Sequence, residues 1–188
     1  MRALVTGGES GFGKELVVEL GSKSMGISYT SGFDISIPIE REKILQQSED
    51  FDVFVNFAHR NFDQTRLLYE VGFHWQHLGK KGHIFNIGSY GTHFDSDTFE
   101  LWKSSKYSLD VAHKQFRKMR EVGVVGFDLT LIRLGLLDTV KNRSHRNWNK
   151  NAHSPRQLAR LIHQIYESDQ KSLFSEVDFH WLQSDQNC

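Results

Sequence analysis

The sequence has almost no cysteine and no long hydrophobic run. Its single cysteine is Cys188, so no disulfide can form within the chain. No apolar run approaches the roughly 18 residues that a membrane-spanning helix needs. The first residues also lack the charged start and cleavage site of a secretory signal. These absences argue against a membrane protein or a disulfide-stabilised secreted domain, and we expect a protein of the reducing cytoplasm.

The chain also has no excess charge of either sign. Lys plus Arg and Asp plus Glu number 23 each, so no overall field draws the protein to nucleic acid or to a membrane surface. Hydrophobic residues make up 38% and charged residues 24%, proportions that exclude global disorder. A length of 188 residues suits one domain, residues 1–188, and leaves little room for a separate substrate domain.

Two periodicities alternate along the chain. Apolar or β-branched runs predict strands over residues 1–6, 27–30, 51–56, 83–87, 124–134 and 174–179. Helical spacing predicts helices over residues 14–20, 40–48, 61–78, 99–121 and 155–168. The core-facing candidates of the third helix are Leu67, Leu68, Val71 and Trp75. The alternation predicts an α/β protein of three layers, a Rossmann-like doubly wound parallel sheet flanked by helices on both faces.

A glycine-rich turn, Thr6-Gly7-Gly8-Glu9-Ser10-Gly11-Phe12-Gly13, lies between the first strand and the first helix. Glycines are needed where a Cβ would collide with a phosphate or hold the helix away from the strand. The start of the helix supplies free N–H groups and the positive end of the helix dipole. The turn therefore predicts a phosphate site, although a plain loop would also explain a glycine cluster.

A second interpretation of this turn concerns nucleoside triphosphates. Gly8 to Lys14 satisfies G-x-x-x-x-G-K, the phosphate loop of triphosphatases, but Glu15 follows. That loop needs Ser or Thr there to hold magnesium, and a carboxylate would repel the phosphates. The strand ending at Asn56 also supplies no second acidic ligand. The pattern favours a dinucleotide over a triphosphate.

Residues downstream of the turn occur in the order found in one enzyme family. Asp34 follows the second strand, Asn56-Phe57-Ala58-His59 ends the third, and Asn61, Ser89 and Lys106 come after it. With the T-G-x-x-x-G-x-G pattern of Thr6 to Gly13, the chain resembles the short-chain dehydrogenases/reductases over nearly its whole length. The usual Asn-Asn-Ala-Gly is here Asn56 to His59, and the usual Pro-Gly is Leu134-Gly135.

The resemblance implies a nicotinamide dinucleotide cofactor and a set of residues that hold it. Asn61, Ser89 and Lys106 match the catalytic Asn, Ser and Lys of the family. The implied cofactor-binding residues are Thr6, Gly7, Gly11, Phe12, Gly13, Ser31, Asp34, Ile35, Asn56, Ala58, Lys106 and Gly135.

One catalytic residue of the family is missing. Its tyrosine should stand four residues before Lys106 and thirteen after Ser89, but that residue is Trp102. In the family the tyrosine hydroxyl exchanges a proton while hydride passes to or from the nicotinamide. A general acid must titrate near the working pH, and an indole N–H essentially never releases its proton there. Trp102 therefore cannot replace tyrosine as a proton shuttle.

Nearby residues offer partial substitutes. Tyr107 lies one residue beyond Lys106, which turns it about 100° away on a helix. Tyr90 adjoins Ser89, and neighbours leaving a strand tend to face opposite sides. His93 is of the residue type that titrates near neutral pH, and with Asp95 it follows Ser89 in the loop that shapes the family's substrate cleft. We keep His93 and Tyr90 as candidate acids, with solvated loop residues as the alternative.

Other departures concern the cofactor itself. His59 replaces a glycine that lets the cofactor approach the sheet, and the stretch from Asn56 to Asn61 is short, so the resemblance is to a trimmed member. An acidic residue after the second strand would bind the adenine ribose and repel the extra phosphate of NADP. Thr30-Ser31-Gly32 carries no carboxylate there, and Lys14 and Lys23 lie in the general area. The sequence therefore favours NADP(H) over NAD(H), although the usual arginine clamp is absent.

The remaining features bear on partners. A basic run in the family's substrate-lid position would suit a small anionic substrate, unless it is simply solvated: Lys141, Arg143, His145, Arg146 and Lys150, with Trp148 among them. His74 and His77 lack Cys or carboxylate partners nearby, so we expect no metal site. Apolar residues on several faces of the long helix, where the family forms its dimer interface, imply a homodimer or homotetramer.

Two hypotheses follow from the sequence. Ser89, Lys106 and Asn61 favour an atypical NAD(P)(H)-dependent oxidoreductase that acts on a small carbonyl or alcohol. Its proton would come from water or from a non-standard residue. Trp102 and His59 favour a catalytically silent dinucleotide-binding sensor or interaction protein with the same fold.

Overall fold

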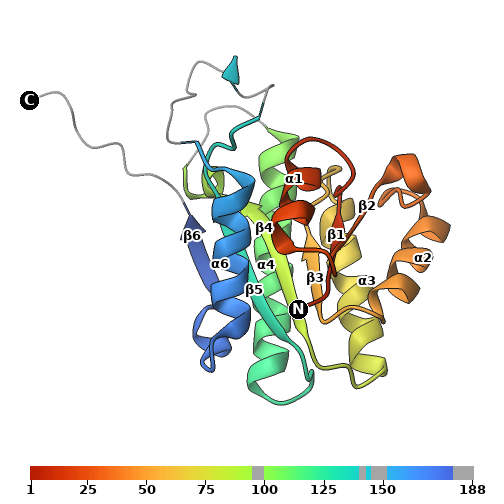
Figure 1. The fold of residues 1–188 in the computed structure, drawn as a ribbon. Helices are drawn as coiled ribbons and strands as arrows, with labels where there is room; N and C mark the ends of the chain where they lie inside the picture. Colours follow the sequence, from red (N-terminus) through yellow and green to blue (C-terminus); the bar gives the residue numbers. More distant parts are fainter. Residues whose placement is uncertain (95–99, 140–142, 145–151, 180–188) are drawn as a thin grey trace, which may run out of the picture.

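The computed structural model describes residues 1–94, 100–139, 143–144 and 152–179. In this part of the chain, six parallel strands form one sheet in the order β2-β1-β3-β4-β5-β6 (Figure 1). The strands are β1 (Ala3–Thr6), β2 (Met25–Ile27), β3 (Val53–Asn56), β4 (His83–Ser89), β5 (Asp128–Leu134) and β6 (Glu176–Phe179). The predicted parallel sheet is confirmed.

Helices cover both faces of the sheet, which makes the three predicted layers (Figure 1). The helices are α1 (Gly11–Leu20), α2 (Pro38–Ser48), α3 (Asp63–His77), α4 (Leu101–Glu121) and α6 (Pro155–Glu167). Short 3-10 turns are η1 (Tyr29–Ser31), η2 (Tyr90–His93) and η3 (Lys171–Leu173). One core lies between the sheet and α2, α3 and α4, and the other lies between the sheet and α1 and α6.

Successive side chains of a strand point alternately into these two cores. In β3, Phe54 packs in the α3–α4 core, whereas Val53 and Val55 pack in the α1–α6 core. The predicted core face of α3 is confirmed, since its four candidates, Leu67, Leu68, Val71 and Trp75, are fully buried. None of the described helices is both long and apolar enough to cross a membrane.

Several boundaries differ from the predicted ones by a few residues, and two of the differences have clear local causes. The second strand ends at Ile27, because the Ser28 side chain accepts a hydrogen bond from the Thr30 N–H and caps η1. The third helix begins at Asp63 and not at Asn61, whose φ of 46° lies in the left-handed region. A residue in that conformation cannot join a right-handed helix.

The strand order fixes where a ligand can bind. The chain runs outward from β1 to β2 on one side and from β3 to β6 on the other. In such sheets the reversal leaves a crevice at the carboxyl ends of the strands on either side of it. A ligand-binding site is therefore expected at the carboxyl ends of β1 and β3.

Candidate functional site

The glycine turn after β1 is held by close backbone approaches. A Cβ at Gly13 would lie 2.1 Å from the Gly7 carbonyl oxygen, so this glycine lets α1 close onto the turn. A Cβ at Gly26 would lie 2.2 Å from the Gly8 oxygen, so β2 also touches the turn. Gly7 and Gly11 have φ angles of 72° and 48°, which favour glycine.

The start of α1 presents backbone donors beside this turn. The Lys14 N–H bonds the Ser10 oxygen, so the N–H groups just before it have no acceptor within the helix. The first turn of α1 carries no acidic residue, which leaves the dipole end free for an anion. Phe12 is buried and stacks on Phe57 with ring centroids 5.7 Å apart. These features fit the diphosphate of a dinucleotide.

Thr6 joins the turn to the end of β3. Its buried Oγ1 accepts hydrogen bonds from the N–H groups of Phe57 and Ala58, each at 3.0 Å. Ala58 also lies within 3.4 Å of a Cβ built on Gly7. The side chain of Asn56 is buried and donates to Asn86 Oδ1 at 3.1 Å. The residues predicted around the cofactor turn are therefore brought together at the ends of β1 and β3.

Glu9 is a further residue of this site that the sequence does not predict, and it extends from the turn to the end of β2. Its Oε2 accepts hydrogen bonds from Ser28 Oγ at 2.5 Å and from Thr30 Oγ1 at 3.1 Å. These bonds, chiefly the one from Ser28, hold the pKa of Glu9 below its usual range. The carboxylate missing from the β2 end of the sequence is thus supplied from 19 residues earlier in the chain.

The other residues predicted near the adenine are held by local contacts. Asp34 accepts from the Ser36 N–H at 2.8 Å and pairs with Arg60 at 2.7 Å. The Ser36 N–H is the main cause that lowers the pKa of Asp34. Ile35 is buried in the core, and the Ser31 hydroxyl donates to the Ser28 oxygen. The side chains of Ile35 and Ser31 are therefore engaged within the protein, and any cofactor contact there would use their backbone.

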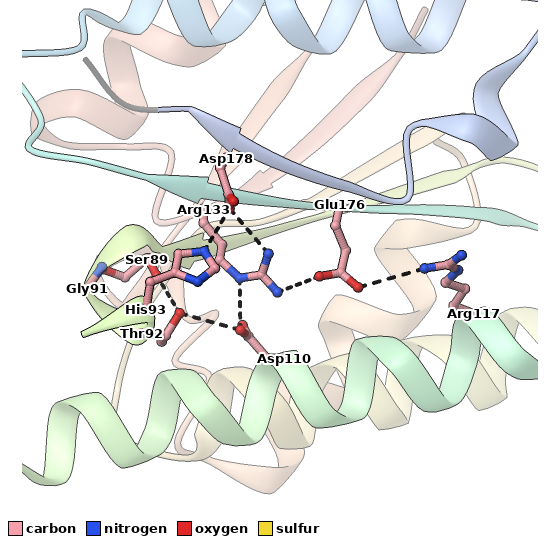
Figure 2. Close-up of polar contacts among 9 residues, drawn as sticks. All are labelled: Ser89, Gly91, Thr92, His93, Asp110, Arg117, Arg133, Glu176 and Asp178. Atoms are coloured by element: carbon pink, nitrogen blue, oxygen red, sulfur yellow. Dashed lines mark hydrogen bonds and ion pairs between the residues drawn. The ribbon is translucent and has the colours of Figure 1, made fainter. Parts of the chain in front are cut away.

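Ser89 and Trp102 meet at the carboxyl end of β4. Ser89 Oγ accepts from the Gly91 N–H at 3.1 Å (Figure 2). A Cβ built on Gly91 would lie 3.3 Å from both Ser89 Oγ and Trp102 Cη2. The indole therefore packs against the turn that carries Ser89, and 44% of Trp102 is exposed. Trp102, for which the resemblance implies a tyrosine, carries no hydroxyl of its own, and its indole N–H is not a proton donor of suitable pKa.

Lys106 lies buried one turn of α4 after Trp102. Its Nζ donates to Gln64 Oε1 at 2.8 Å and to the Ile87 oxygen at 3.1 Å. Burial lowers the pKa of Lys106 to about 8, and Asp110 opposes this shift. Among the described residues these are the two acceptors of the ammonium group, so its third proton can be donated to a ligand.

The amide that meets Lys106 is Gln64 and not Asn61. Gln64 is buried on the first turn of α3 and also donates to the Asn56 oxygen at 2.7 Å. Asn61 is exposed and precedes α3. The structure thus does not bring Asn61 to Lys106. A weak sequence indication of Gln64 was available, since it is a polar residue at the start of an apolar helix.

His59 crosses from the end of β3 to α4. Its Nε2 lies 2.9 Å from Ser105 Oγ, which itself donates to the Trp102 oxygen at 2.6 Å. Because the Ser105 proton is used there, the geometry assigns the N–H to His59 Nε2. Desolvation and then the Lys106 cation lower the pKa of His59 to about 4. His59 is therefore a neutral imidazole just beyond the end of β3, at a position for which the resemblance implies a glycine.

The side chain of His93, one of the two candidate acids, is directed toward β6. Its Nε2 lies 3.1 Å from Asp178 Oδ1 of β6 (Figure 2). The other candidate, Tyr90, packs against the His93 ring, with centroids 5.1 Å apart.

Gly135, one of the predicted cofactor-binding residues, follows β5. Its N–H donates to the Phe179 oxygen at 3.0 Å.

Several predictions lie partly or wholly outside the described residues. Arg143 pairs with Asp138 at 2.7 Å. Asp95 and most of the basic run lie outside: Lys141, His145, Arg146, Trp148 and Lys150. The expectation that His74 lacks a carboxylate partner is wrong, since its Nε2 lies 2.8 Å from Glu49 Oε1. Within the described ranges, no group of three or more His, Cys, Asp or Glu side chains could hold a metal ion.

Comparison with known proteins gives structural matches only. No protein-family model matches the sequence, and no curated protein matches it. A short-chain dehydrogenase from Burkholderia cenocepacia J2315, in complex with NADP, has a TM-score of 0.72 at 14% identity. The match covers 95% of this chain and 87% of that one.

Two further solved structures are similar. A 3-ketoacyl-(acyl-carrier-protein) reductase from Brucella melitensis, complexed with NADH, has a TM-score of 0.73 at 15% identity over 94% of this chain and 95% of that chain. A 3-alpha-hydroxysteroid dehydrogenase from Pseudomonas sp. B-0831, complexed with NADH, has a TM-score of 0.69 at 18% identity over 94% of each chain. The chain therefore has the fold of short-chain dehydrogenases.

Proposed function

We propose that this protein binds a nicotinamide dinucleotide and is an atypical oxidoreductase of the short-chain dehydrogenase/reductase type, acting on a small carbonyl or alcohol. One observation carries the proposal. The glycine turn and Ser89 lie at the carboxyl ends of β1 and β4, the two neighbours of β3 in the sheet. Thr6 bonds the Ala58 N–H just beyond β3, His59 lies 2.9 Å from Ser105 of α4, and Lys106 of α4 donates to the Ile87 oxygen of β4. A bound nicotinamide would supply or accept hydride there, as it does in enzymes that use this cofactor.

The protein's own groups have distinct parts in this proposal. The backbone donors of α1 bind the diphosphate. The third proton of Lys106 is directed to a ribose hydroxyl, and the Ser89 hydroxyl holds the substrate oxygen. The indole of Trp102 shields that oxygen but gives it no proton, so water or a non-standard residue must do so.

A second candidate function rests on Trp102 and on the contacts of Lys106. A lysine that donates two protons to Gln64 and Ile87 is anchored inside the protein. An arrangement of this kind also suits a catalytically silent dinucleotide-binding sensor. The two functions share the cofactor site and differ in the transfer of hydride.

Cofactor selection follows from Glu9. The sequence favoured NADP(H) because residues 30–32 carry no carboxylate, but the Glu9 carboxylate lies beside Ser28 and Thr30. A carboxylate at the end of β2 accepts hydrogen bonds from a ribose diol and repels a ribose phosphate. We therefore propose NAD(H) as the preferred cofactor, in place of the NADP(H) that the sequence favoured.

Binding is tested with a matched pair of glycine variants. Gly11 and Gly79 both have positive φ angles, 48° and 61°, and a Cβ on either meets nothing within 4 Å. Gly11→Asp places a carboxylate at the start of α1, and Gly79→Asp places it beyond the end of α3. Calorimetric titration with NADH should show Gly11→Asp weakening binding about tenfold or more, and Gly79→Asp leaving it unchanged. Equal affinities in both variants, or no binding by the parent at millimolar NADH, would contradict the proposal.

The proposed oxidoreductase activity is tested by placing a tyrosine hydroxyl at position 102. Trp102→Tyr places a phenol beside Ser89, and we expect a rise in turnover on a panel of small carbonyls. The control is Trp102→Phe, which removes the indole but adds no acid. Oxidoreductase activity in the parent would refute the silent alternative. If the parent and the Trp102→Tyr variant both bind NADH but neither oxidises it, the proposed oxidoreductase function is refuted.

A further inference from the structure

The guanidinium of Arg133 lies buried between β5, β6 and α4 (Figure 2). Its Nε donates to Asp110 Oδ2 at 2.9 Å, its Nη2 to Glu176 Oε2 at 2.6 Å and its Nη1 to Asp178 Oδ1 at 3.3 Å. Only 5% of the Arg133 side chain is exposed. Each guanidinium nitrogen thus donates to a different carboxylate, and these three carboxylates come from two elements.

The pattern of β6 explains why this cation is needed. Glu176 and Asp178 are two residues apart and so share one face of the strand, whereas Val177 and Phe179 pack in the α1–α6 core on the other face. The register places Arg133 directly beside Asp178. Without a cation on β5, two carboxylates would face a third on α4, which is costly in a partly buried site.

Two of these carboxylates have a second task. Asp178 Oδ1 accepts a hydrogen bond from His93 Nε2 at 3.1 Å, since a carboxylate can only accept. Thr92 Oγ1 lies 3.5 Å from Asp110 Oδ2 and donates to the Ser89 oxygen at 2.8 Å. The η2 turn, which follows Ser89, is therefore attached to β6 through His93.

This attachment bears on the Ser89 site. Ser89 Oγ accepts from the Gly91 N–H, and Gly91 packs against the Trp102 indole. His93 is only two residues beyond Gly91 in the same 3-10 turn. A displacement of His93 is therefore transmitted to Gly91 and to the environment of Trp102.

We propose that Asp178 is a positioning residue for Ser89: it holds His93, and through η2 it sets the place of Gly91 and the Ser89 hydroxyl. The importance of this role rests on the proposed function. The geometry itself is testable whether or not the protein transfers hydride.

The chain offers a matched control in Glu176. Both carboxylates lie on the same face of β6 and both accept from Arg133, but in the described residues only Asp178 also bonds the η2 turn. Asp178→Asn and Glu176→Gln each remove one charge from Arg133, and Asp178→Asn also weakens the bond from His93, because an amide oxygen is a weaker acceptor than a carboxylate. A difference between the two variants at the Ser89 site therefore reports the contact with His93.

Trp102 provides the readout. The full chain, with its four tryptophans, is labelled with 5-fluorotryptophan, and the Trp102 resonance in the fluorine NMR spectrum is assigned from Trp102→Phe. Asp178→Asn should shift or broaden the Trp102 resonance, whereas Glu176→Gln should leave it in place. The resonance of Trp75, which is fully buried beside Phe127, monitors the fold.

If Asp178→Asn fails to fold, variants of His93 test the positioning role of Asp178 instead. His93→Ala removes the bond from the turn and should reproduce the Trp102 shift, and His93→Gln, which can still donate to Asp178, should restore the parental resonance. A Trp102 resonance that His93→Ala leaves unmoved overturns the proposal. An equal shift in Glu176→Gln also overturns it, because the effect would then be general loss of charge.

Kinetics separate this inference from the proposed function. If the protein is an oxidoreductase, Asp178→Asn should lower kcat for the carbonyl substrate while its NADH affinity stays that of the parent. A parent that fails to bind NADH would refute the proposed function and leave the Trp102 comparison as a valid test of Asp178. Lower NADH affinity in Asp178→Asn, with the Trp102 resonance unmoved, would refute the positioning role alone.

Discussion

At the scale of single residues, Glu9 makes the sharpest prediction about the cofactor. Glu9→Gln keeps the size of the side chain and a hydrogen-bonding oxygen for Ser28 but removes the charge. Because a carboxylate repels a ribose phosphate, we expect the NADPH to NADH affinity ratio to rise about tenfold, which corresponds to about 1.4 kcal/mol. The ratio is measured by parallel titration with both cofactors.

Glu19 serves as the control for this substitution. It lies near the end of α1, the helix that follows Glu9, and Glu19→Gln removes the same charge from the domain. An equal rise in both variants would show that only the overall charge matters. No change in Glu9→Gln would remove the basis for NAD(H) preference.

Residue-level sequence reasoning reached the glycine turn because its spacing is local. Gly7, Gly11 and Gly13 lie within one strand-to-helix connection, so their backbone needs are visible in the pattern. Glu9 and Gln64 were missed because their partners are distant, at 19 residues for Ser28 and 42 for Lys106. No spacing rule predicts a hydrogen bond between residues so far apart in the sequence.

At the scale of elements, the approach of β2 to the glycine turn can be tested at Gly26. A Cβ there would meet the Gly8 backbone at 2.2 Å, so Gly26→Ala must push β2 and the turn apart. We expect a loss of about 1–3 kcal/mol of unfolding free energy and weaker NADH binding. Urea unfolding and titration measure both effects.

The control for this prediction is Gly126→Ala. A Cβ at Gly126 meets its nearest atom, the Lys80 oxygen, at 3.4 Å, which is an ordinary contact. This variant should fold and bind as the parent does. A Gly26→Ala protein with parental stability would mean that the turn can move away from β2 without cost.

Element types were predictable where apolar periodicity was long, as in α3 and α4. The ends were not, because they depend on single side chains. The end of β2 is set by the Ser28 cap, and the start of α3 by the left-handed Asn61. Likewise, the alternation in β6 places Glu176 and Asp178 on one face, but no periodicity shows that they pair with Arg133, which lies more than forty residues earlier.

At the scale of the whole molecule, buried histidines tie stability to pH. His83 is fully buried and bonds Thr130 Oγ1 at 2.8 Å, and desolvation lowers its pKa from 6.5 to about 3. Between these values the unfolded chain binds a proton that the folded chain does not. The free energy of unfolding should therefore fall on acidification from pH 6.5 by up to about 1.4 kcal/mol per pH unit for this group.

His83→Gln tests this dependence, because glutamine can still donate to Thr130 but does not titrate. Its unfolding free energy, measured by urea titration from pH 7 to pH 4, should depend less steeply on pH than that of the parent, by about one proton. An unchanged slope would show that His83 is protonated in the folded state and would contradict its lowered pKa.

The last prediction for the whole molecule concerns association with a second copy of the chain. Tyr107 and Val111 lie one turn apart on α4 and are 41% and 56% exposed, and Phe73 of α3 is 50% exposed beside Phe116. Exposed apolar side chains on two helices that pack together suit an isologous contact with a second copy of the chain. Val111→Glu should therefore shift the protein to monomer in light scattering after size exclusion. Val18→Glu, on α1 and 71% exposed, adds the same charge elsewhere and should leave the oligomer intact, whereas a parent that is already monomeric would refute the interface.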